Sequence, residues 1–220
     1  MDNLSVEINE GIATITIDRP PANAFVLAMY DGMVEIIKDL DTRLDDVHAI
    51  IIRSTGRMFV AGNEISEFLD IEKGEQIVDY TRHVADCMDA IYNARVPVIA
   101  AVQGVCVGGG LAIAASCDMI VAGEKAMFGV PEVQVGLIGC GDFFRLMVPE
   151  KIARQYVYSA DMIPAAEVRQ YGGVNKLVAP GEEYDAAVAL AKTFMIRAPR
   201  GVEFFKQAMN ETLDRRLREK

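Results

Sequence analysis

The most informative stretch of this chain is Gly104-Val105-Cys106-Val107-Gly108-Gly109-Gly110, which runs directly into Leu111-Ala112-Ile113-Ala114-Ala115. The apolar residues before it predict a strand, and the small residues after it predict a helix. Glycine lets a ligand approach the backbone closely, and the start of a helix places N–H groups at the positive end of its dipole. Such a turn is typical of a site that holds an anion or a developing oxyanion.

Length and composition indicate an ordinary globular protein. The chain has 220 residues, 51% of them hydrophobic and 25% charged, which favours one domain or a domain with a small appendage. No apolar run approaches the roughly 20 residues that span a bilayer. The N-terminus lacks the basic patch of a signal peptide, and the C-terminal Arg218-Glu219-Lys220 is not a retention or peroxisomal address. We therefore expect a cytoplasmic protein with no membrane partner.

The charge balance limits the class of partner. A net charge of -10 argues against nucleic acid or an anionic membrane, because both require a basic surface. An anionic small molecule remains possible where cations cluster locally, as Arg53 and Arg57 do beside one loop, although most such side chains are simply solvated.

The cysteines and histidines do not form a site in the sequence. Four cysteines lie in apolar or glycine-rich settings without the spacing of metal ligands, so we expect buried, reduced thiols and no metal. They are Cys87, Cys106, Cys117 and Cys140. His48 and His83 are isolated, which argues against a catalytic part for either.

Hydrophobic periodicity predicts strands that alternate with helices, and hence βαβ units and a mainly parallel sheet with a helical C-terminal third. The expected strands are residues 5–8, 12–17, 48–52, 96–102, 119–121 and 174–178. The expected helices are residues 26–40, 77–92, the stretch after the glycines, 142–147, 149–158, 164–170, 184–196 and 199–217. Residues 128–132 are expected to form a loop.

A second loop, Phe59-Val60-Ala61-Gly62-Asn63-Glu64-Ile65, also follows a predicted strand and leads into a predicted helix. If the two strands are neighbours in a parallel sheet, both loops leave it at the edge where open α/β sheets bind ligands. Two N–H groups would then converge on one oxygen.

The glycines have other possible interpretations. They can form a tight turn or allow close helix packing without any ligand. A Walker phosphate loop is excluded because no Gly-Lys-Ser or Gly-Lys-Thr occurs, and the dinucleotide pattern fails where Ile113 stands instead of a small residue.

Four motifs in this order resemble the crotonase superfamily, the enoyl-CoA hydratases and isomerases, over about residues 4–210. They are Arg19-Pro20-Pro21-Ala22-Asn23-Ala24, the loop from Phe59 to Ile65, the glycine turn with Cys117-Asp118, and Phe128-Gly129-Val130-Pro131-Glu132-Val133. The resemblance implies an α/β fold, a spiral of repeated ββα units with a small second sheet.

By the same resemblance, residues 1–180 would form the spiral core with the acyl-CoA site, and residues 181–220 a helical trimerisation region. A homotrimer or a dimer of trimers is expected. The chain ends at Lys220, where members of this family typically continue into another helical segment, so the C-terminal region is expected to be short.

The resemblance also implies the site residues. The N–H groups of Asn63 and Gly109 would form an oxyanion hole, and Ala61, Gly62, Ile65 and Gly108 would join Asn63 in binding CoA. The ligand is then an acyl-CoA thioester that serves as substrate, with no further cofactor.

The general base is inferred from a departure from the family pattern. Hydratases of the family use two glutamates, and here the first position is Ala112 while the second is Glu132. Hydration is disfavoured by the loss of one carboxylate, whereas a single base suffices to move a double bond. A solvated loop carboxylate is the alternative for Glu132, although its apolar neighbours suggest a pocket that raises its pKa.

Asp142 is a second carboxylate to weigh, because it stands where the family usually has a Gly-Thr-Gln run. It is expected to cap a helix N-terminus, although an acid near the acyl chain would restore hydratase chemistry. Phe143 and Phe144 would either narrow the acyl pocket or pack in the core.

Three functions follow from these residues. The favoured hypothesis is an enoyl-CoA isomerase with Glu132 as its only acid/base. Hydration or decarboxylation through the same enolate is the first alternative. An acyl-CoA-binding protein without catalysis is the second.

Overall fold

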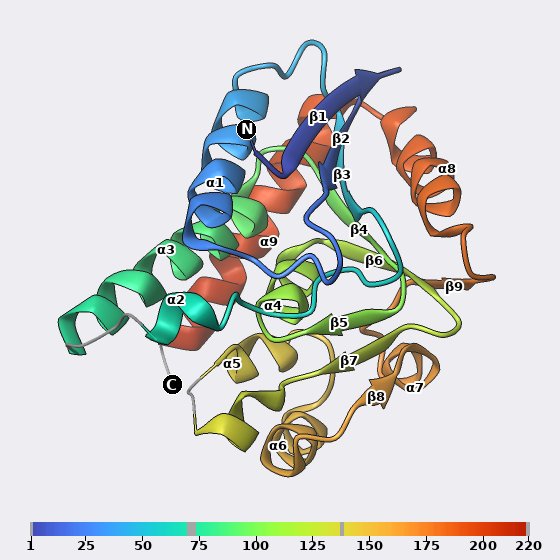
Figure 1. Cartoon of the computed structure of the whole chain (residues 1–220). Helices are drawn as coiled ribbons and strands as arrows, with labels where there is room; N and C mark the ends of the chain where they lie inside the picture. Colours follow the sequence, from blue (N-terminus) through green and yellow to red (C-terminus); the bar gives the residue numbers. More distant parts are fainter. Residues whose placement is uncertain (1, 70–73, 137–138, 219–220) are drawn as a thin grey trace.

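A computed structural model describes residues 2–69, 74–136 and 139–218. Its larger sheet has six strands in the order β1-β2-β3-β4-β6-β9, and a second sheet has the order β5-β7-β8 (Figure 1). All neighbours in the larger sheet are parallel except the β1–β2 hairpin. The larger sheet comprises β1 (Leu4–Asn9), β2 (Ile12–Ile17), β3 (Ala49–Ser54), β4 (Val98–Val102), β6 (Met119–Gly123) and β9 (Lys176–Val178). The smaller comprises β5 (Val105–Val107), β7 (Met127–Gly129) and β8 (Ile163–Pro164).

Helices cover both faces of the larger sheet (Figure 1). Helices α1 (Leu27–Asp41) and α3 (Gly74–Asn93) pack on one face, and α8 (Glu183–Met195) packs on the other. In β3, Ile50 and Ile52 belong to the core under α1, whereas Ala49 and Ile51 belong to the core under α8. A strand buried on both faces is apolar at every position, which explains why this stretch predicts a strand without alternation.

The chain winds so that successive segments supply one strand to each sheet. β4 lies in the larger sheet, β5 in the smaller, and α4 (Gly109–Ser116) follows; β6 and β7 repeat the pattern. This is the spiral of ββα units that the family resemblance implies. All eight residues of α4 are buried, and Gly110 packs on the Val60 carbonyl, with which an added Cβ would collide.

The predicted strands and most predicted helices are confirmed, but short elements were missed. β5, β7 and β8 have three residues or fewer, too few to show a period of two. The expected loop at residues 128–132 is wrong in part, because it contains the end of β7 and the start of a 3-10 helix, η1 (Pro131–Val135). The helix expected at 142–147 ends early, as α5 (Gly141–Phe144). The remaining helices are α2 (Ser66–Leu69), α6 (Glu150–Ser159), α7 (Ala165–Gln170) and α9 (Pro199–Arg218).

The C-terminal helix α9 is attached through buried charges. The Lys206 ammonium lies 2.7 Å from an Asp118 carboxylate oxygen and donates to the Val96 carbonyl at 3.1 Å. The Arg95 guanidinium pairs with Glu203, which is also buried. Since a buried charge must be paired, these contacts fix where α9 meets the start of β4.

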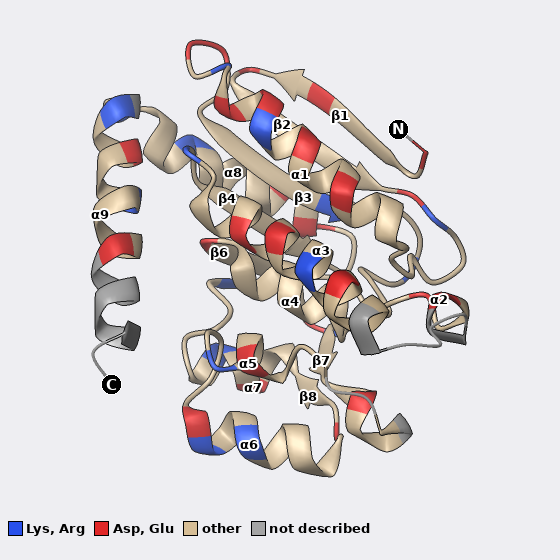
Figure 2. Cartoon of the chain, turned by 90° about the vertical axis from the view of Figure 1, so that its left-hand side faces the viewer, with Lys and Arg blue, Asp and Glu red and all other residues tan. Residues whose placement is uncertain are grey.

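The surface agrees with the acidic composition. On α1 and α3 acidic side chains outnumber basic ones (Figure 2), among them the exposed Asp31, Glu35, Asp39, Asp79 and Asp86. Across the described ranges, no helix combines the length and the apolar character needed to cross a membrane.

Candidate active site

The two loops singled out in the sequence lie side by side. β3 and β4 are parallel neighbours, so the segments that follow them leave the sheet at the same edge. Beyond that edge, Val107 N–H donates to the Val60 carbonyl and Phe59 N–H donates to the Val105 carbonyl, both at 3.0 Å. The two strands are therefore neighbours in a parallel sheet, as two convergent N–H groups require.

The orientation of the Asn63 N–H is fixed by hydrogen bonds on either side of it. Phe25 N–H donates to the Gly62 carbonyl at 2.9 Å, and Glu64 N–H donates to the Phe25 carbonyl at 2.7 Å. In a trans peptide the C=O and the following N–H point in opposite directions, so the Asn63 N–H points away from Phe25. It donates to no acceptor within the described residues. Gly62 makes this turn possible with a φ of 102°.

The second N–H belongs to Gly109, the first residue of α4. The first N–H groups of a helix have no partner inside it, and the helix dipole makes this end positive. An added Cβ on Gly109 would collide with the Tyr30 hydroxyl and would lie 2.5 Å from Asn63 Oδ1. Gly109 and Asn63 are thus immediate neighbours, and only glycine fits at position 109.

Glu132 lies against the same turn. It is the second residue of η1, and an added Cβ on Gly108 would lie 2.9 Å from its Oε1. Oε1 accepts a long 3.4 Å hydrogen bond from Cys140 N–H, while Oε2 is buried and has no partner within the described residues. Burial raises the pKa of Glu132 above its ordinary value, because the charged form loses its water. The structure thus places a poorly satisfied carboxylate beside the two N–H groups.

The other positions weighed as acids do not join Glu132. Ala112 is fully buried in the core. The Asp142 side chain is 96% exposed and lies 3.8 Å from Arg145, although it shares a cavity of about 350 Å³ with Glu132. The expected N-cap at Asp142 is wrong: Cys140 holds that place, since the helix begins at Gly141, and Asp142 lies in its first turn.

The aromatic pair after Asp142 packs inward. Phe144 is fully buried in the core, with its ring 6.4 Å from the Tyr156 ring, and Phe143 packs against the same core. For Phe144 the core alternative is therefore the one observed.

Four of the five residues expected to contact CoA lie in the loop of residues 61–65, and the fifth, Gly108, lies in the adjacent glycine turn. Ala61 N–H donates to the Ala22 carbonyl at 3.1 Å, which connects this loop to the segment before α1. An added Cβ on Gly108 would lie 3.4 Å from Gly62 Cα. The Ile65 side chain is 66% exposed and open to a ligand. CoA binding by Ala61, Gly62, Asn63, Ile65 and Gly108 stays a prediction.

One residue of the site was missed in the sequence. Tyr30 is fully buried on α1, and its hydroxyl donates to Asn63 Oδ1 at 2.5 Å. It lies beside Met29 and Met33 among the buried residues of α1, a position typical of a core side chain. The sequence offers one signal for Tyr30. A tyrosine at a core position of a helix needs a hydrogen-bond partner for its hydroxyl, so it indicates a polar group nearby.

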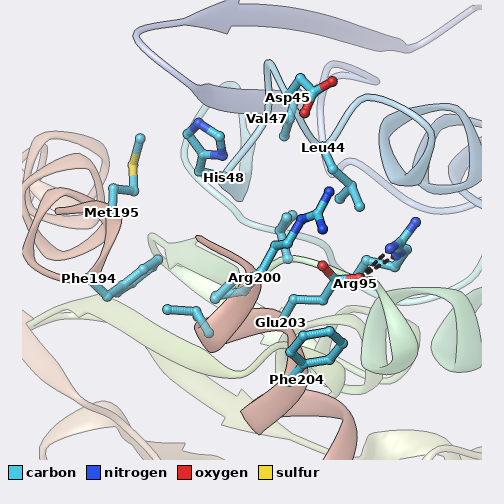
Figure 3. Close-up of a pocket in the computed structure, with 13 residues that line it drawn as sticks. Leu44, Asp45, Val47, His48, Arg95, Phe194, Met195, Arg200, Glu203 and Phe204 are labelled. Carbon is cyan, nitrogen blue, oxygen red and sulfur yellow. Dashed lines mark hydrogen bonds and ion pairs between the residues drawn. The ribbon is translucent and has the colours of Figure 1, made fainter. Parts of the chain in front are cut away.

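The remaining candidates lie elsewhere. Figure 3 shows a cavity of about 470 Å³ lined by His48, Arg95, Arg200 and Glu203, among others. Part of its lining directly precedes β3 and β4, so it lies at the opposite edge of the sheet from Asn63 and Gly109, and the rest comes from α8 and α9. His83 contacts Asp31 at 2.5 Å, and Arg53 stacks 4.5 Å from the centre of the Tyr184 ring. The cysteines are free; Cys87, Cys106 and Cys140 are buried, as predicted, whereas Cys117 is only partly buried.

Comparisons with known proteins agree with this geometry. The enoyl-CoA hydratase/isomerase family model matches residues 7–220. A short-chain-enoyl-CoA hydratase of Clostridium acetobutylicum is 35% identical over 96% of this chain and 82% of its own. A (7aS)-7a-methyl-1,5-dioxo-2,3,5,6,7,7a-hexahydro-1H-indene-carboxyl-CoA hydrolase of Mycobacterium tuberculosis is 33% identical over 91% and 81%.

A solved enoyl-CoA hydratase structure from Mycobacterium smegmatis superimposes with a TM-score of 0.92 at 27% identity. That match covers 97% of this chain and 84% of the other. The chain is a member of the enoyl-CoA hydratase/isomerase family and has its crotonase fold.

Proposed function

We propose that this protein moves a carbon–carbon double bond within an acyl-CoA thioester, with Glu132 as the only acid/base. The observation that carries the proposal is the position of Glu132. Its carboxylate lies against Gly108, next to the N–H groups of Asn63 and Gly109, and Ala112 stands where a second glutamate would be required for paired acid/base work.

The geometry supports a two-step proton transfer. Glu132 removes a proton from the α-carbon of a 3-enoyl thioester, and the electron pair moves onto the thioester oxygen. The Asn63 and Gly109 N–H groups would stabilise that enolate oxygen, and one such donor is worth about 10²- to 10³-fold in rate. Glu132 then returns the proton to the γ-carbon, which gives the 2-enoyl product with no net gain or loss of atoms.

The environment of Glu132 suits this part. A general base works best when its pKa is near the working pH, and burial raises the pKa of Glu132 in that direction. Its unpartnered Oε2 is available to accept a proton because no other described group uses it.

Hydrolysis is a second candidate function. The Mycobacterium tuberculosis and Rhodococcus jostii relatives at 33% identity are named as hydrolases of a ring-bearing carboxyl-CoA. The same oxyanion hole would serve this reaction, with Glu132 activating a water molecule instead of moving a substrate proton.

The proposal extends to binding and assembly. Acyl-CoA would lie along residues 61–65 and need no further cofactor. A homotrimer or a dimer of trimers is supported by the apolar side chains that α9 exposes, Phe204, Phe205 and Met209. Light scattering would measure that mass, and a monomer at micromolar concentration would contradict this part.

The deciding experiment supplies a trans-3-enoyl-CoA and crotonyl-CoA in heavy water and follows product masses. Conversion of the 3-enoyl thioester with deuterium at the α- or γ-carbon and no added water is the expected result. Addition of water to crotonyl-CoA would show that the protein is a hydratase and would contradict the proposed isomerisation. If neither thioester changes, isomerisation is rejected, and release of CoA or opening of a ring-bearing thioester is tested next.

A further inference from the structure

The Tyr30 hydroxyl lies at the junction of the two loops that carry the N–H groups. It donates to Asn63 Oδ1 at 2.5 Å, and the Tyr30 ring packs 4.9 Å from the ring of Phe25. Phe25 is also the residue whose backbone holds the peptides on both sides of Asn63. Segment 25–30 therefore contacts the Asn63 loop through backbone and side chain at once.

The bonded pair of side chains fills the space between the loops. An added Cβ on Gly109 would meet the Tyr30 hydroxyl oxygen and Asn63 Oδ1 before any other atom. Both oxygens thus pack directly on the Cα of the residue that supplies the second N–H. The Tyr30–Asn63 hydrogen bond is in effect a spacer between the Asn63 loop and the start of α4.

Within the described residues, no backbone hydrogen bond joins the two segments closer to the two donors. The Val107 N–H to Val60 carbonyl bond joins the two segments, but it precedes Gly109 by two residues and Asn63 by three. The Phe25 bonds set the direction of the Asn63 N–H without touching Gly109. Backbone packing of Gly110 on the Val60 carbonyl also holds the two segments together, but the Tyr30–Asn63 pair is the contact that lies against Gly109 itself.

We propose that Tyr30 is a positioning residue, which sets the separation of the Asn63 and Gly109 N–H groups through Asn63 Oδ1. The inference rests on the proposed function in so far as those groups stabilise an enolate. Tyr30 does not contact the reacting atoms in this account. Burial raises the pKa of its phenol well above the ordinary value, so the hydroxyl stays protonated and remains a donor at any working pH.

The test removes only the hydroxyl. Tyr30→Phe keeps the ring in the core and leaves Asn63 Oδ1 without its donor. Because misplacing a catalytic group by about 1 Å costs up to about 10²-fold, we expect kcat for α-proton exchange to fall about tenfold while KM changes less than twofold. The matched control is Tyr156→Phe, which removes a tyrosine hydroxyl that donates to Glu167 at 3.0 Å on the α6 side. That control should keep its kcat.

A second variant shows whether Tyr30 acts through Asn63. In an Asn63→Ala background, which retains the backbone N–H, Tyr30→Phe should change kcat less than twofold. An equal loss in both backgrounds would overturn the proposal, as would an unchanged kcat for Tyr30→Phe in the native background.

A spectroscopic readout separates this proposal from the proposed reaction. A saturated acyl-CoA with ¹³C at its thioester carbonyl is bound to the protein, and the infrared C=O band is compared between variants. Two well-placed donors should lower the frequency in the native protein, and Tyr30→Phe should reverse part of that shift. A native protein that binds and polarises the saturated thioester but does not isomerise the trans-3-enoyl-CoA rejects the proposed reaction and keeps the Tyr30 proposal. Identical bands in the two proteins reject the Tyr30 proposal.

Discussion

The two halves of the candidate site are built differently. Around Asn63 and Gly109, backbone hydrogen bonds of 2.7 to 3.1 Å hold the neighbouring peptides, and within the described residues the Asn63 N–H donates to no acceptor. Glu132 has a single long bond of 3.4 Å and one buried oxygen without a partner in the described ranges. Rigid donors suit a charge that develops at one place, whereas a base must exchange a proton and so benefits from an unsatisfied oxygen.

The largest expected effect comes from removing the base. Glu132→Gln keeps the shape of the side chain but cannot take a proton, so exchange of the substrate α-proton should fall by about 10²- to 10⁴-fold. The control is Asp142→Asn, which removes an exposed carboxylate from the same cavity and should leave the rate unchanged. A Glu132→Gln protein with native exchange would show that another group is the base.

A smaller effect is expected when a side-chain carbon is added beside the Asn63 and Gly109 N–H groups. In Gly109→Ala the new Cβ collides with the Tyr30 hydroxyl, so the free energy of unfolding should fall by about 1–3 kcal/mol and exchange should slow as the donors separate. In the control, Gly201→Ala on α9, the nearest atom would be 3.8 Å away, and stability should rise by about 0.5–1 kcal/mol. Urea denaturation of both variants measures the difference. Equal stabilities would mean that the turn has room to relax.

The smallest effect is a pH dependence of stability that only the base side should show. Burial raises the pKa of Glu132 in the folded state above its ordinary 4.5. The folded protein then binds more protons than the unfolded chain between those two values, so this group destabilises the fold increasingly as pH rises through them. Glu132→Gln should therefore have a higher melting temperature than the native protein at about pH 8 and an equal one at about pH 4.

If the melting temperatures of Glu132→Gln and the native protein differ by the same amount at both pH values, the native Glu132 carboxylate is solvated and not buried. The catalytic rate has the opposite dependence, because the base must be ionised. It should fall as pH drops through the raised pKa of Glu132.

Sequence patterns identified the donor side better than the base side. Gly62, Gly108 and Gly109 could be recognised because only glycine permits the backbone angles and the close contacts seen there. The strands β3 and β4 could be recognised because strands covered on both faces are continuously apolar. Backbone sites thus leave a clear mark on the sequence.

Other features of the site and fold could not be predicted, because they depend on contacts between residues that are far apart in the sequence or on elements too short to show a pattern. The N-cap of α5 is Cys140, two residues before the expected Asp142, and the Asp142 side chain is exposed to solvent. Tyr30 occupies a core position of α1, and only the fold shows that its hydroxyl reaches Asn63, thirty-three residues later. The three strands of the second sheet are too short for hydrophobic periodicity to predict them.

The use of peptide N–H groups at Asn63 and Gly109 has a consequence for how this scaffold changes over generations. A backbone donor is present whichever side chain the codon specifies, so point substitutions rarely erase it, except where bulk cannot be tolerated. Carboxylates such as Glu132 are gained or lost in a single step. Chains of this type can therefore exchange one reaction for another by altering a few acids, while the backbone donors are inherited unchanged.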